Sequence, residues 1–253
     1  MGPYARLYIS VIYFTRKSLY KMDPQTLFPA WNALEPKQKK LLFDQIQTFD
    51  LQIIEKQRSL LLNEKPTLDP LSVFERYENN GNLSNIEIGK KMIQDGKVGC
   101  LIVAGGQGSR LQYKEPKGFY PVTIIRKKSL FQLFAEKILA AGAQVGRPLY
   151  VAIMTSLQNH ESTLDIFKKN NLFGLSPDQL FFFSQKELPL LNANGNLFLE
   201  SACRFSMGPD GNASALKQFV SSGIWDNWNE KGISYINYLH IDNPLADPFD
   251  AEM

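Results

Sequence analysis

The sequence predicts an α/β protein built on a mostly parallel sheet that is flanked by helices. Short apolar runs typical of buried strands recur along the chain, and the first of them ends abruptly in glycines. Helical patterns of about ten to fifteen residues separate these runs, as in βαβ units. Such units are right-handed and place their strands parallel.

The first predicted strand, residues 98–104, is an apolar run with β-branched residues and no charge. A short run of this kind is typical of a strand that is buried on both faces. Gly105, Gly106 and Gly108 follow it. Glycines let the backbone approach a ligand closely, and successive N–H groups in such a turn bind anions. We therefore expect a nucleotide-binding loop after this strand.

Cations follow the glycines, at Arg110, Lys114 and Lys117, and indicate a phosphate-rich ligand. Leu111 stands where a dinucleotide fingerprint requires its third glycine, and the Gly-Lys-Ser/Thr of a P-loop is absent. Pro116 disfavours helix before it, so the loop is expected to stay extended. The alternative is a glycine-rich turn with solvated surface cations.

The rest of the chain continues the alternation. We expect helices to begin at Pro24, at Pro36 (through Ile53), at Ser84 (to Gly96), at Ser129 (to Gly142), at His160 and at Ala213. We expect strands at residues 148–155, 180–184 and 233–241, while residues 197–205 fit either a strand or a strand followed by a turn. Ligands of parallel sheets bind beyond the carboxyl ends of the strands. That rule brings Met154, Gln185 and Asp242 to the same crevice as the glycines.

The bulk composition is that of an ordinary globular protein, with 253 residues of which 44% are hydrophobic and 21% are charged. A net charge of +3 gives no indication of nucleic-acid binding. The apolar run near the amino terminus is shorter than the ~20 residues of a membrane helix, so we expect no membrane partner. Two cysteines, Cys100 and Cys203, provide neither a disulfide framework nor a metal site and fit a reducing, cytoplasmic environment.

Three regions are predicted. Residues 1–21 are basic and are expected to be a disordered extension. Residues 22–96 are expected to form a helical segment with a wrapping loop. Residues 97–253 are expected to form the nucleotide-binding α/β domain.

The glycine loop resembles a known family. Residues 104–111, A-G-G-Q-G-S-R-L, with P-K-G at 116–118, are similar to the signature of UTP-dependent sugar pyrophosphorylases, in particular the eukaryotic-type UDP-N-acetylglucosamine pyrophosphorylases. Ser109 replaces a usual Thr and Gln112 a usual Gly. The resemblance covers residues 22–253 and only the amino-terminal half of the family, so it implies a fragment or a truncated gene whose Rossmann-like nucleotidyltransferase sheet is incomplete at its carboxyl-terminal end.

The resemblance implies a uridylyltransferase that forms UDP-N-acetylglucosamine and pyrophosphate from UTP and N-acetylglucosamine-1-phosphate. One alternative is a pyrophosphorylase for UDP-glucose or another UDP-sugar. Another is a nucleotide-binding fragment without turnover. A nicotinamide-dependent oxidoreductase is disfavoured by Leu111, and a purely structural partner protein would leave the cations without a ligand.

The resemblance also implies roles for individual residues. Arg110 would contact the leaving pyrophosphate and Lys117 the nucleotide phosphates, as catalytic groups. The implied nucleotide-binding residues are Gly105, Gly106, Gln107, Gly108, Ser109, Met154, Gln185 and Gly211. Asn212 would contact the sugar, where relatives that use UDP-glucose typically carry His. Asp242 would hold Mg²⁺, which needs only one or two carboxylates beside phosphate oxygens. Without the resemblance, Asp242 is a helix cap and residues 209–212 are a turn.

Overall fold

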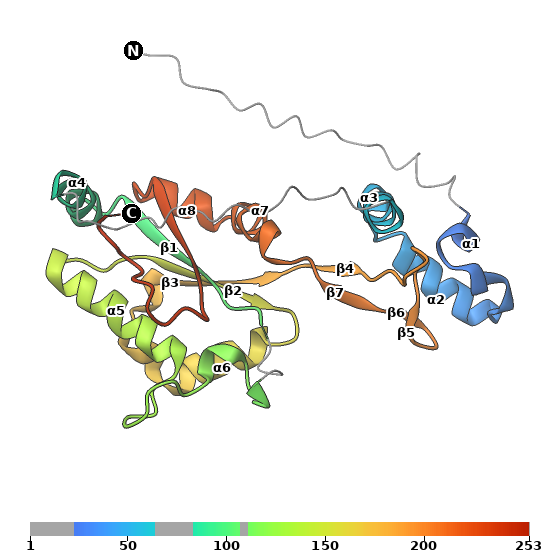
Figure 1. Cartoon of the computed structure of the whole chain (residues 1–253), viewed down its shortest axis with the longest axis horizontal. Helices are drawn as coiled ribbons and strands as arrows, with labels where there is room; N and C mark the ends of the chain where they lie inside the picture. Colours follow the sequence, from blue (N-terminus) through green and yellow to red (C-terminus); the bar gives the residue numbers. More distant parts are fainter. Residues whose placement is uncertain (1–22, 64–82, 107–110, 253) are drawn as a thin grey trace, which may run out of the picture. The chain divides into compact units, whose positions relative to one another are not determined.

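Four parallel strands form the central sheet, in the order β3-β2-β1-β8 (Figure 1). The strands are β1 (Val98–Val103), β2 (Val151–Ser156), β3 (Leu180–Gln185) and β8 (Tyr235–His240). In this computed structural model, residues 23–63, 83–106 and 111–252 are described. In register, Cys100 of β1 lies opposite Val151 of β2 and Asn237 of β8. The predicted fold class, a parallel α/β sheet, is confirmed.

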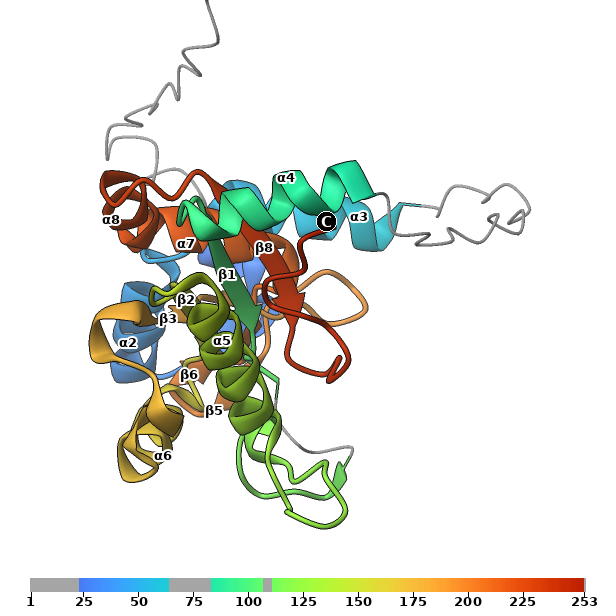
Figure 2. The ribbon, with the colours of Figure 1, turned by 90° about the vertical axis from the view of Figure 1, so that its left-hand side faces the viewer.

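Helices cover both faces of this sheet. They are α4 (Leu83–Gln94), α5 (Leu130–Val145), α6 (His160–Lys169), α7 (Ala215–Ser221) and α8 (Ile224–Glu230). Figure 1 shows α5 and α6 on one face and α7 and α8 on the other, and Figure 2 shows β1 between β2 and β8. Since α5 connects β1 to β2 and α6 connects β2 to β3, both steps are parallel crossovers.

Strand β1 is buried on both faces, as its unbroken apolar run predicts. Cys100 and Ile102 pack with α5 and α6, whereas Leu101 and Val103 pack with α7 and α8. Position 99 of the same strand requires glycine, because an added Cβ would lie 2.3 Å from Cζ3 of the buried Trp228. The strand that carries the glycine loop is therefore enclosed by side chains on both of its faces.

A second unit is built from helices and short strands. Its elements are α1 (Pro24–Leu27), η2 (Pro29–Ala33), α2 (Pro36–Ile46), α3 (Leu51–Leu62), β5 (Leu199–Ser201) and β6 (Arg204–Phe205). Phe205 is fully buried in its core, with its ring centroid 5.7 Å from that of Phe28 and 5.9 Å from that of Phe49. For residues 197–205 the sequence fitted either a strand or a strand followed by a turn. In the structure, β5 and β6 form an antiparallel pair joined by a turn.

The division between the units differs from the predicted boundary after residue 96. The described parts of 70–187 and 209–253 form the sheet unit, and those of 1–69 with 188–208 form the other. The chain passes between the units along the paired strands β4 (Glu187–Pro189) and β7 (Met207–Pro209). Helix α4 thus groups with the sheet, and its Ile93 packs in the sheet's core. The predicted extension, residues 1–21, lies outside the described residues, as does most of the predicted wrapping loop.

Two predicted helix boundaries are wrong, each for a local reason. The single helix expected from Pro36 to Ile53 is broken, because the Asp50 side chain accepts hydrogen bonds from the backbone N–H groups of Gln52 and Ile53 and starts α3. The helix expected to end at Gly142 continues to Val145. Gly146 ends it in the left-handed conformation, with φ of 70°.

One helix was missed by the sequence analysis. Gly223 follows α7, and α8 begins at the next residue and buries Ile224 and Trp228. These two apolar residues, four positions apart, were the available signal. None of the helices in the described part of the chain combines the length and the apolar character that crossing a lipid bilayer requires.

Replacement of Gly99 by alanine tests the enclosure of β1. The new methyl group would clash with the Trp228 ring, and overpacking of a buried site costs about 1–3 kcal/mol. Gly99→Ala is therefore expected to lower the free energy of unfolding by that amount in urea titrations. Gly106→Ala is the matched control, since its nearest neighbour would be Lys117 Cδ at 3.8 Å. Equal stability of the two variants would contradict the enclosure.

Candidate functional site

The carboxyl ends of the strands surround a cavity of about 310 Å³. Its lining includes Gly105 and Gly106 after β1, Ser156 at the end of β2, Gln185 at the end of β3, and Gly211 and Asn212 beyond β7. Because β1, β2 and β3 are parallel, their carboxyl ends meet at one edge of the sheet. Segments that lie far apart in the sequence therefore form one hollow.

Gly105 is required by its distance from Gln185. A Cβ at position 105 would lie 2.9 Å from Gln185 Oε1 and 3.4 Å from the backbone nitrogen of Ser156. Gln185 is itself buried, with 4% of its surface exposed, so its amide is held against the glycine. The amide offers both a donor and an acceptor, as recognition of an imide base requires.

Asn159 fastens the glycine turn to β2, and the sequence analysis missed it. Its amide nitrogen donates to the carbonyl oxygen of Gly105 at 3.3 Å, and its Oδ1 accepts from the backbone N–H of Ser156 at 2.8 Å. Asn159 occupies the N-cap position of α6 without capping the helix through its side chain. In a sequence, an asparagine directly before a helix indicates an N-cap, so nothing in the sequence indicated that Asn159 bonds to Gly105 instead.

A second wall of the cavity is formed by the turn at Gly211 and Asn212. Gly211 has φ of 87°, a conformation that favours glycine. The carbonyl oxygen of Asn212 accepts from the Tyr238 hydroxyl at 3.1 Å, and its side-chain amide nitrogen lies 3.3 Å from His240 Nδ1. Both partners stand on β8, so that strand supports the wall. The sequence analysis does not single out Tyr238 or His240.

Lys117 and Asp242 form an ion pair in which Nζ lies 2.7 Å from Oδ2. Lys117 begins the short helix η4 (Lys117–Phe119), and its backbone N–H donates to the carbonyl oxygen of Gly106 at 3.4 Å. Asp242 follows β8. The hydrogen bond from Lys117 lowers the pKa of Asp242 from its usual 3.8, although partial burial of the carboxyl opposes this effect. The carboxylate is therefore ionised at neutral pH.

The loop that carries Asp242 is clamped to helix α5. Lys137 Nζ donates to the carbonyl oxygens of Pro244 at 2.8 Å and of Ala246 at 2.7 Å. Further along, the side-chain amide of Asn237 donates to the carbonyl oxygens of residues 247 and 248, each at 3.1 Å. These bonds fix the backbone that follows Asp242.

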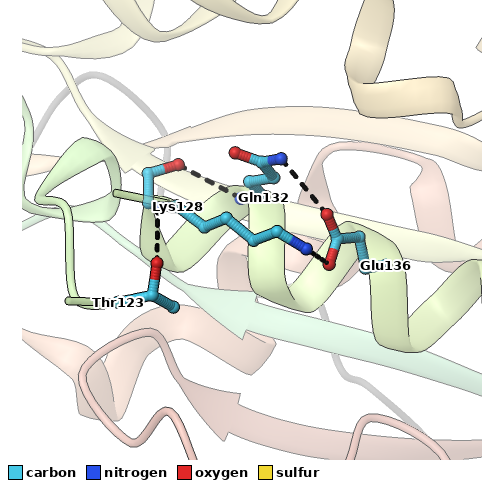
Figure 3. Close-up of polar contacts among 5 residues, drawn as sticks. Thr123, Lys128, Gln132 and Glu136 are labelled. Carbon is cyan, nitrogen blue, oxygen red and sulfur yellow. Dashed lines mark hydrogen bonds and ion pairs between the residues drawn. The ribbon is translucent and has the colours of Figure 1, made fainter. Parts of the chain in front are cut away.

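The segment after Lys117 is anchored in a similar way. An added Cβ on Gly118 would lie 2.1 Å from the ring of Phe131, so η4 packs directly on α5. The chain then forms a hairpin-like loop, in which the backbone N–H of Lys128 donates to Thr123 Oγ1 at 2.7 Å. Lys128 Nζ also pairs with Glu136 of α5, which accepts a second bond from Gln132 (Figure 3).

The predicted site residues fall into four groups. Gly105, Gly106, Gln185, Gly211 and Asn212 line the cavity, and Lys117 and Asp242 form the ion pair. Met154 instead packs its fully buried side chain against the core on the side of α7 and α8, and only its carbonyl oxygen, which accepts from Ala104 N–H at 2.7 Å, faces the turn. Gln107, Gly108, Ser109 and Arg110 lie outside the described residues.

A metal ion at this site would have one protein carboxylate. No cluster of three or more His, Cys, Asp or Glu side chains in a metal-binding arrangement occurs among the described residues. Asp242 is ionised and half-exposed, with 52% of its side chain accessible. This donor set fits Mg²⁺, which binds through one or two carboxylates and takes its other ligands from water and substrate phosphates.

A parallel sheet with a glycine-lined hollow at its carboxyl edge and a basic side chain beside it is the construction of an α/β nucleotide-binding protein. Comparison of the sequence with known families identifies a match to UTP–glucose-1-phosphate uridylyltransferase over residues 43–253. The chain belongs to this family.

Two similar proteins, from a plant and a yeast, carry UDP-N-acetylglucosamine names. The chain is 33% identical to UDP-N-acetylglucosamine diphosphorylase 2 of Arabidopsis thaliana over 250 residues, which cover 88% of this chain and 49% of the relative. It is 30% identical to UDP-N-acetylglucosamine pyrophosphorylase of Saccharomyces cerevisiae, with 94% of this chain and 52% of the relative covered. The chain thus spans about half the length of these relatives, and the resemblance seen in the glycine loop is confirmed.

A solved structure supports the same grouping. Uridine diphosphate N-acetylglucosamine pyrophosphorylase from Trypanosoma brucei, crystallised with an inhibitor, superimposes with a TM-score of 0.69 and is 26% identical. The superposition covers 93% of this chain and 52% of the other.

Replacement of Gly105 by alanine tests the contact between the glycine turn and Gln185. The new Cβ would displace the Gln185 amide. We expect the Gln185 side chain to move away from the turn, because a Cβ 2.9 Å from its Oε1 is closer than real Cβ contacts allow. The melting temperature is expected to change little, because the amide is the flexible end of a side chain. Crystal structures of the variant and of the unaltered chain measure the movement, and an unmoved Gln185 side chain would contradict the contact.

The ion pair makes a pH-dependent contribution to stability. Because the pKa of Asp242 is lowered in the folded chain, the contribution is present at pH values above 3.8 and is lost as the pH falls through the folded value. For a half-exposed pair it amounts to at most about 1 kcal/mol. Asp242→Asn should therefore destabilise the chain at pH 7 and progressively less toward pH 3, in urea titrations with EDTA present. A deficit that does not vary with pH would rule out this origin.

Proposed function

We propose that this chain contributes the UTP-binding part of a uridylyltransferase that forms UDP-N-acetylglucosamine and pyrophosphate from UTP and N-acetylglucosamine-1-phosphate. The observation that supports it best is the grouping of Gly105, Gln185 and Asn212 around one cavity beside Lys117. The names of the relatives from Arabidopsis and yeast support the same reaction.

The reaction places simple demands on the protein. An oxygen of the sugar-1-phosphate attacks the α-phosphorus of UTP, a new P–O bond forms, and the bond between the α-phosphorus and the β-bridging oxygen breaks. The electron pair of that bond leaves with pyrophosphate, so negative charge builds up on the leaving group. Catalysis of this kind rests on positioning and on charge stabilisation rather than on covalent participation of the protein.

The residues divide these tasks. The Gln185 amide would pair with the uracil edge, and the turn at Gly105 and Gly106 would accept the phosphates on its backbone. Lys117, together with Arg110, would offset the developing charge on the phosphates. Asp242 would hold Mg²⁺, which supplies electrostatic stabilisation of the phosphate oxygens when bound. Asp242 and Lys117 would then exchange part of their mutual pairing for contacts with the substrate.

The choice of sugar rests on Asn212. Its side-chain amide lies at the cavity and offers a donor and an acceptor, which suits the acetamido group of an N-acetylhexosamine. The matched family is described by its glucose-1-phosphate member, so UDP-glucose synthesis is the second candidate. We propose the cytoplasm as the compartment, because Cys100 and Cys203 are free thiols.

Pyrophosphate release tests the proposal. The chain is incubated with Mg²⁺, UTP and either N-acetylglucosamine-1-phosphate or glucose-1-phosphate. We expect release with the N-acetylated sugar and at least about tenfold less with glucose, which lacks the group that the Asn212 amide would bind. UTP binding without any release would favour the alternative, a nucleotide-binding fragment without turnover. Absence of UTP binding by folded protein would refute the proposal.

Replacement of Lys117 by methionine tests the basic side chain. Loss of a cation that stabilises developing phosphate charge should lower kcat/KM about a hundredfold. Lys231→Met is the matched control. Lys231 lies 5.7 Å from the Tyr150 ring, near the start of β2, at the edge of the sheet opposite the cavity. Similar losses in both variants would show that Lys117 has no special role.

A further inference from the structure

Two glutamines in the sheet unit are buried to the same extent. Gln179 and Gln218 each have only 5% of their surface exposed. Gln179 lies at the amino end of β3, where its amide donates to the carbonyl oxygen of Leu149 at 2.7 Å and accepts from Ser176 N–H at 3.0 Å. Gln218 lies on α7, near the carboxyl end of β3. The two residues thus provide equivalent buried amides at opposite edges of the sheet.

Gln218 connects the two walls of the nucleotide cavity. Its Oε1 accepts from the backbone N–H of Lys186 at 2.6 Å, directly after Gln185. Its Nε2 donates to Asp210 Oδ2 at 3.4 Å and to Ser214 Oγ. Asp210 precedes Gly211, and Ser214 follows Asn212 by two residues. One side chain therefore bonds to the wall that carries Gln185 and to the turn that carries Asn212.

The bonds of Gln218 use both ends of the amide. Its neighbours on the buried side of α7 are Ala215 and Phe219, which are apolar, so packing alone does not call for a glutamine there. A buried amide is costly unless its donors and acceptors are paired. In this position the pairing is with the two cavity walls. A backbone bond from Asp210 N–H to the carbonyl oxygen of Lys186, at 2.9 Å, joins the same segments.

We propose that Gln218 is a positioning residue that sets the separation of the Gln185 wall from the Gly211–Asn212 wall and thereby the preference of the cavity for uracil. This inference rests on the proposed UTP binding. The Gln185 amide could pair with uracil or, turned over, with cytosine, since both edges present one donor and one acceptor. Preference for uracil therefore requires a second group that cannot turn over, such as the backbone of the Gly211–Asn212 wall, at a fixed distance from the Gln185 amide. Gln218 bonds to both of these segments.

The test compares Gln218→Met with Gln179→Met in the full chain. Both substitutions remove a buried amide of similar volume, so both should lower the melting temperature. Only Gln218→Met is expected to weaken UTP binding, by about tenfold, as the loss of one hydrogen bond would. Only this variant is expected to reduce the ratio of CTP to UTP dissociation constants toward one. Isothermal titration with each nucleotide measures both quantities.

Two more variants separate the walls. Gln218→Glu keeps the acceptor for Lys186 N–H but places a carboxylate against Asp210, so it should loosen the Asn212 turn alone and lower the uracil preference. Ser214→Ala removes one bond to the same turn and should act in the same direction. Hydrogen exchange at residues 185–187 and 210–214 reports each wall without ligand. If Gln218→Met does not fold, hydrogen exchange in Gln218→Glu and Ser214→Ala still measures how firmly each wall is held.

The outcomes distinguish the inference from the function on which it rests. If the unaltered chain folds but binds no UTP, the proposed function and this inference are both wrong. If the chain binds UTP and Gln218→Met keeps its affinity and preference, only the inference is wrong. The same holds if Gln179→Met causes equal losses, because the effect would then be one of stability.

Discussion

Enclosure of β1 between β2 and β8 is the constraint on which the rest of the structure depends. Both faces of the strand are covered by helices, and both edges carry parallel neighbours. The chain can therefore leave the sheet only at the strand's end, where Gly105 and Gly106 turn it across the ends of β2 and β3. The cavity follows from this geometry, because parallel strands place all their carboxyl ends at one edge.

The ion pair of Lys117 and Asp242 joins segments 125 residues apart in the sequence. Helix α5 holds the segments that carry both partners. The segment of Lys117 is held because Gly118 packs on Phe131, and the segment of Asp242 is held by the hydrogen bonds from Lys137 to Pro244 and Ala246. One helix thus keeps a cation and a carboxylate in register beside the glycine turn. Such prior placement reduces the reorganisation that charged substrates would otherwise require.

Much of this arrangement could be predicted from the sequence. The unbroken apolar run of β1 and the alternation of strands and helices predicted the sheet, and the rule for parallel sheets brought Gln185 and Asp242 to the same edge as the glycines. What could not be predicted depends on long-range contacts. No local sequence pattern indicates that Lys117 pairs with Asp242. None indicates that the Asn159 side chain bonds to Gly105 instead of capping α6, or that Gln218 bonds to two walls of the cavity. Gly142 was predicted to end a helix, but it lies inside α5, where the absence of a side chain allows the carbonyl oxygen of Arg147 to approach closely.

The 2.9 Å distance between a Cβ at position 105 and the Gln185 amide has a consequence for how this protein can change over time. A side chain at position 105 would enter the space that the Gln185 amide occupies, so the effect of a substitution at either position depends on the residue at the other. Their mutational effects should therefore be epistatic, and an altered base preference would have to arise through paired substitutions. Each substitution alone would be expected to weaken binding, so selection for a different nucleobase would act against the first of the two changes.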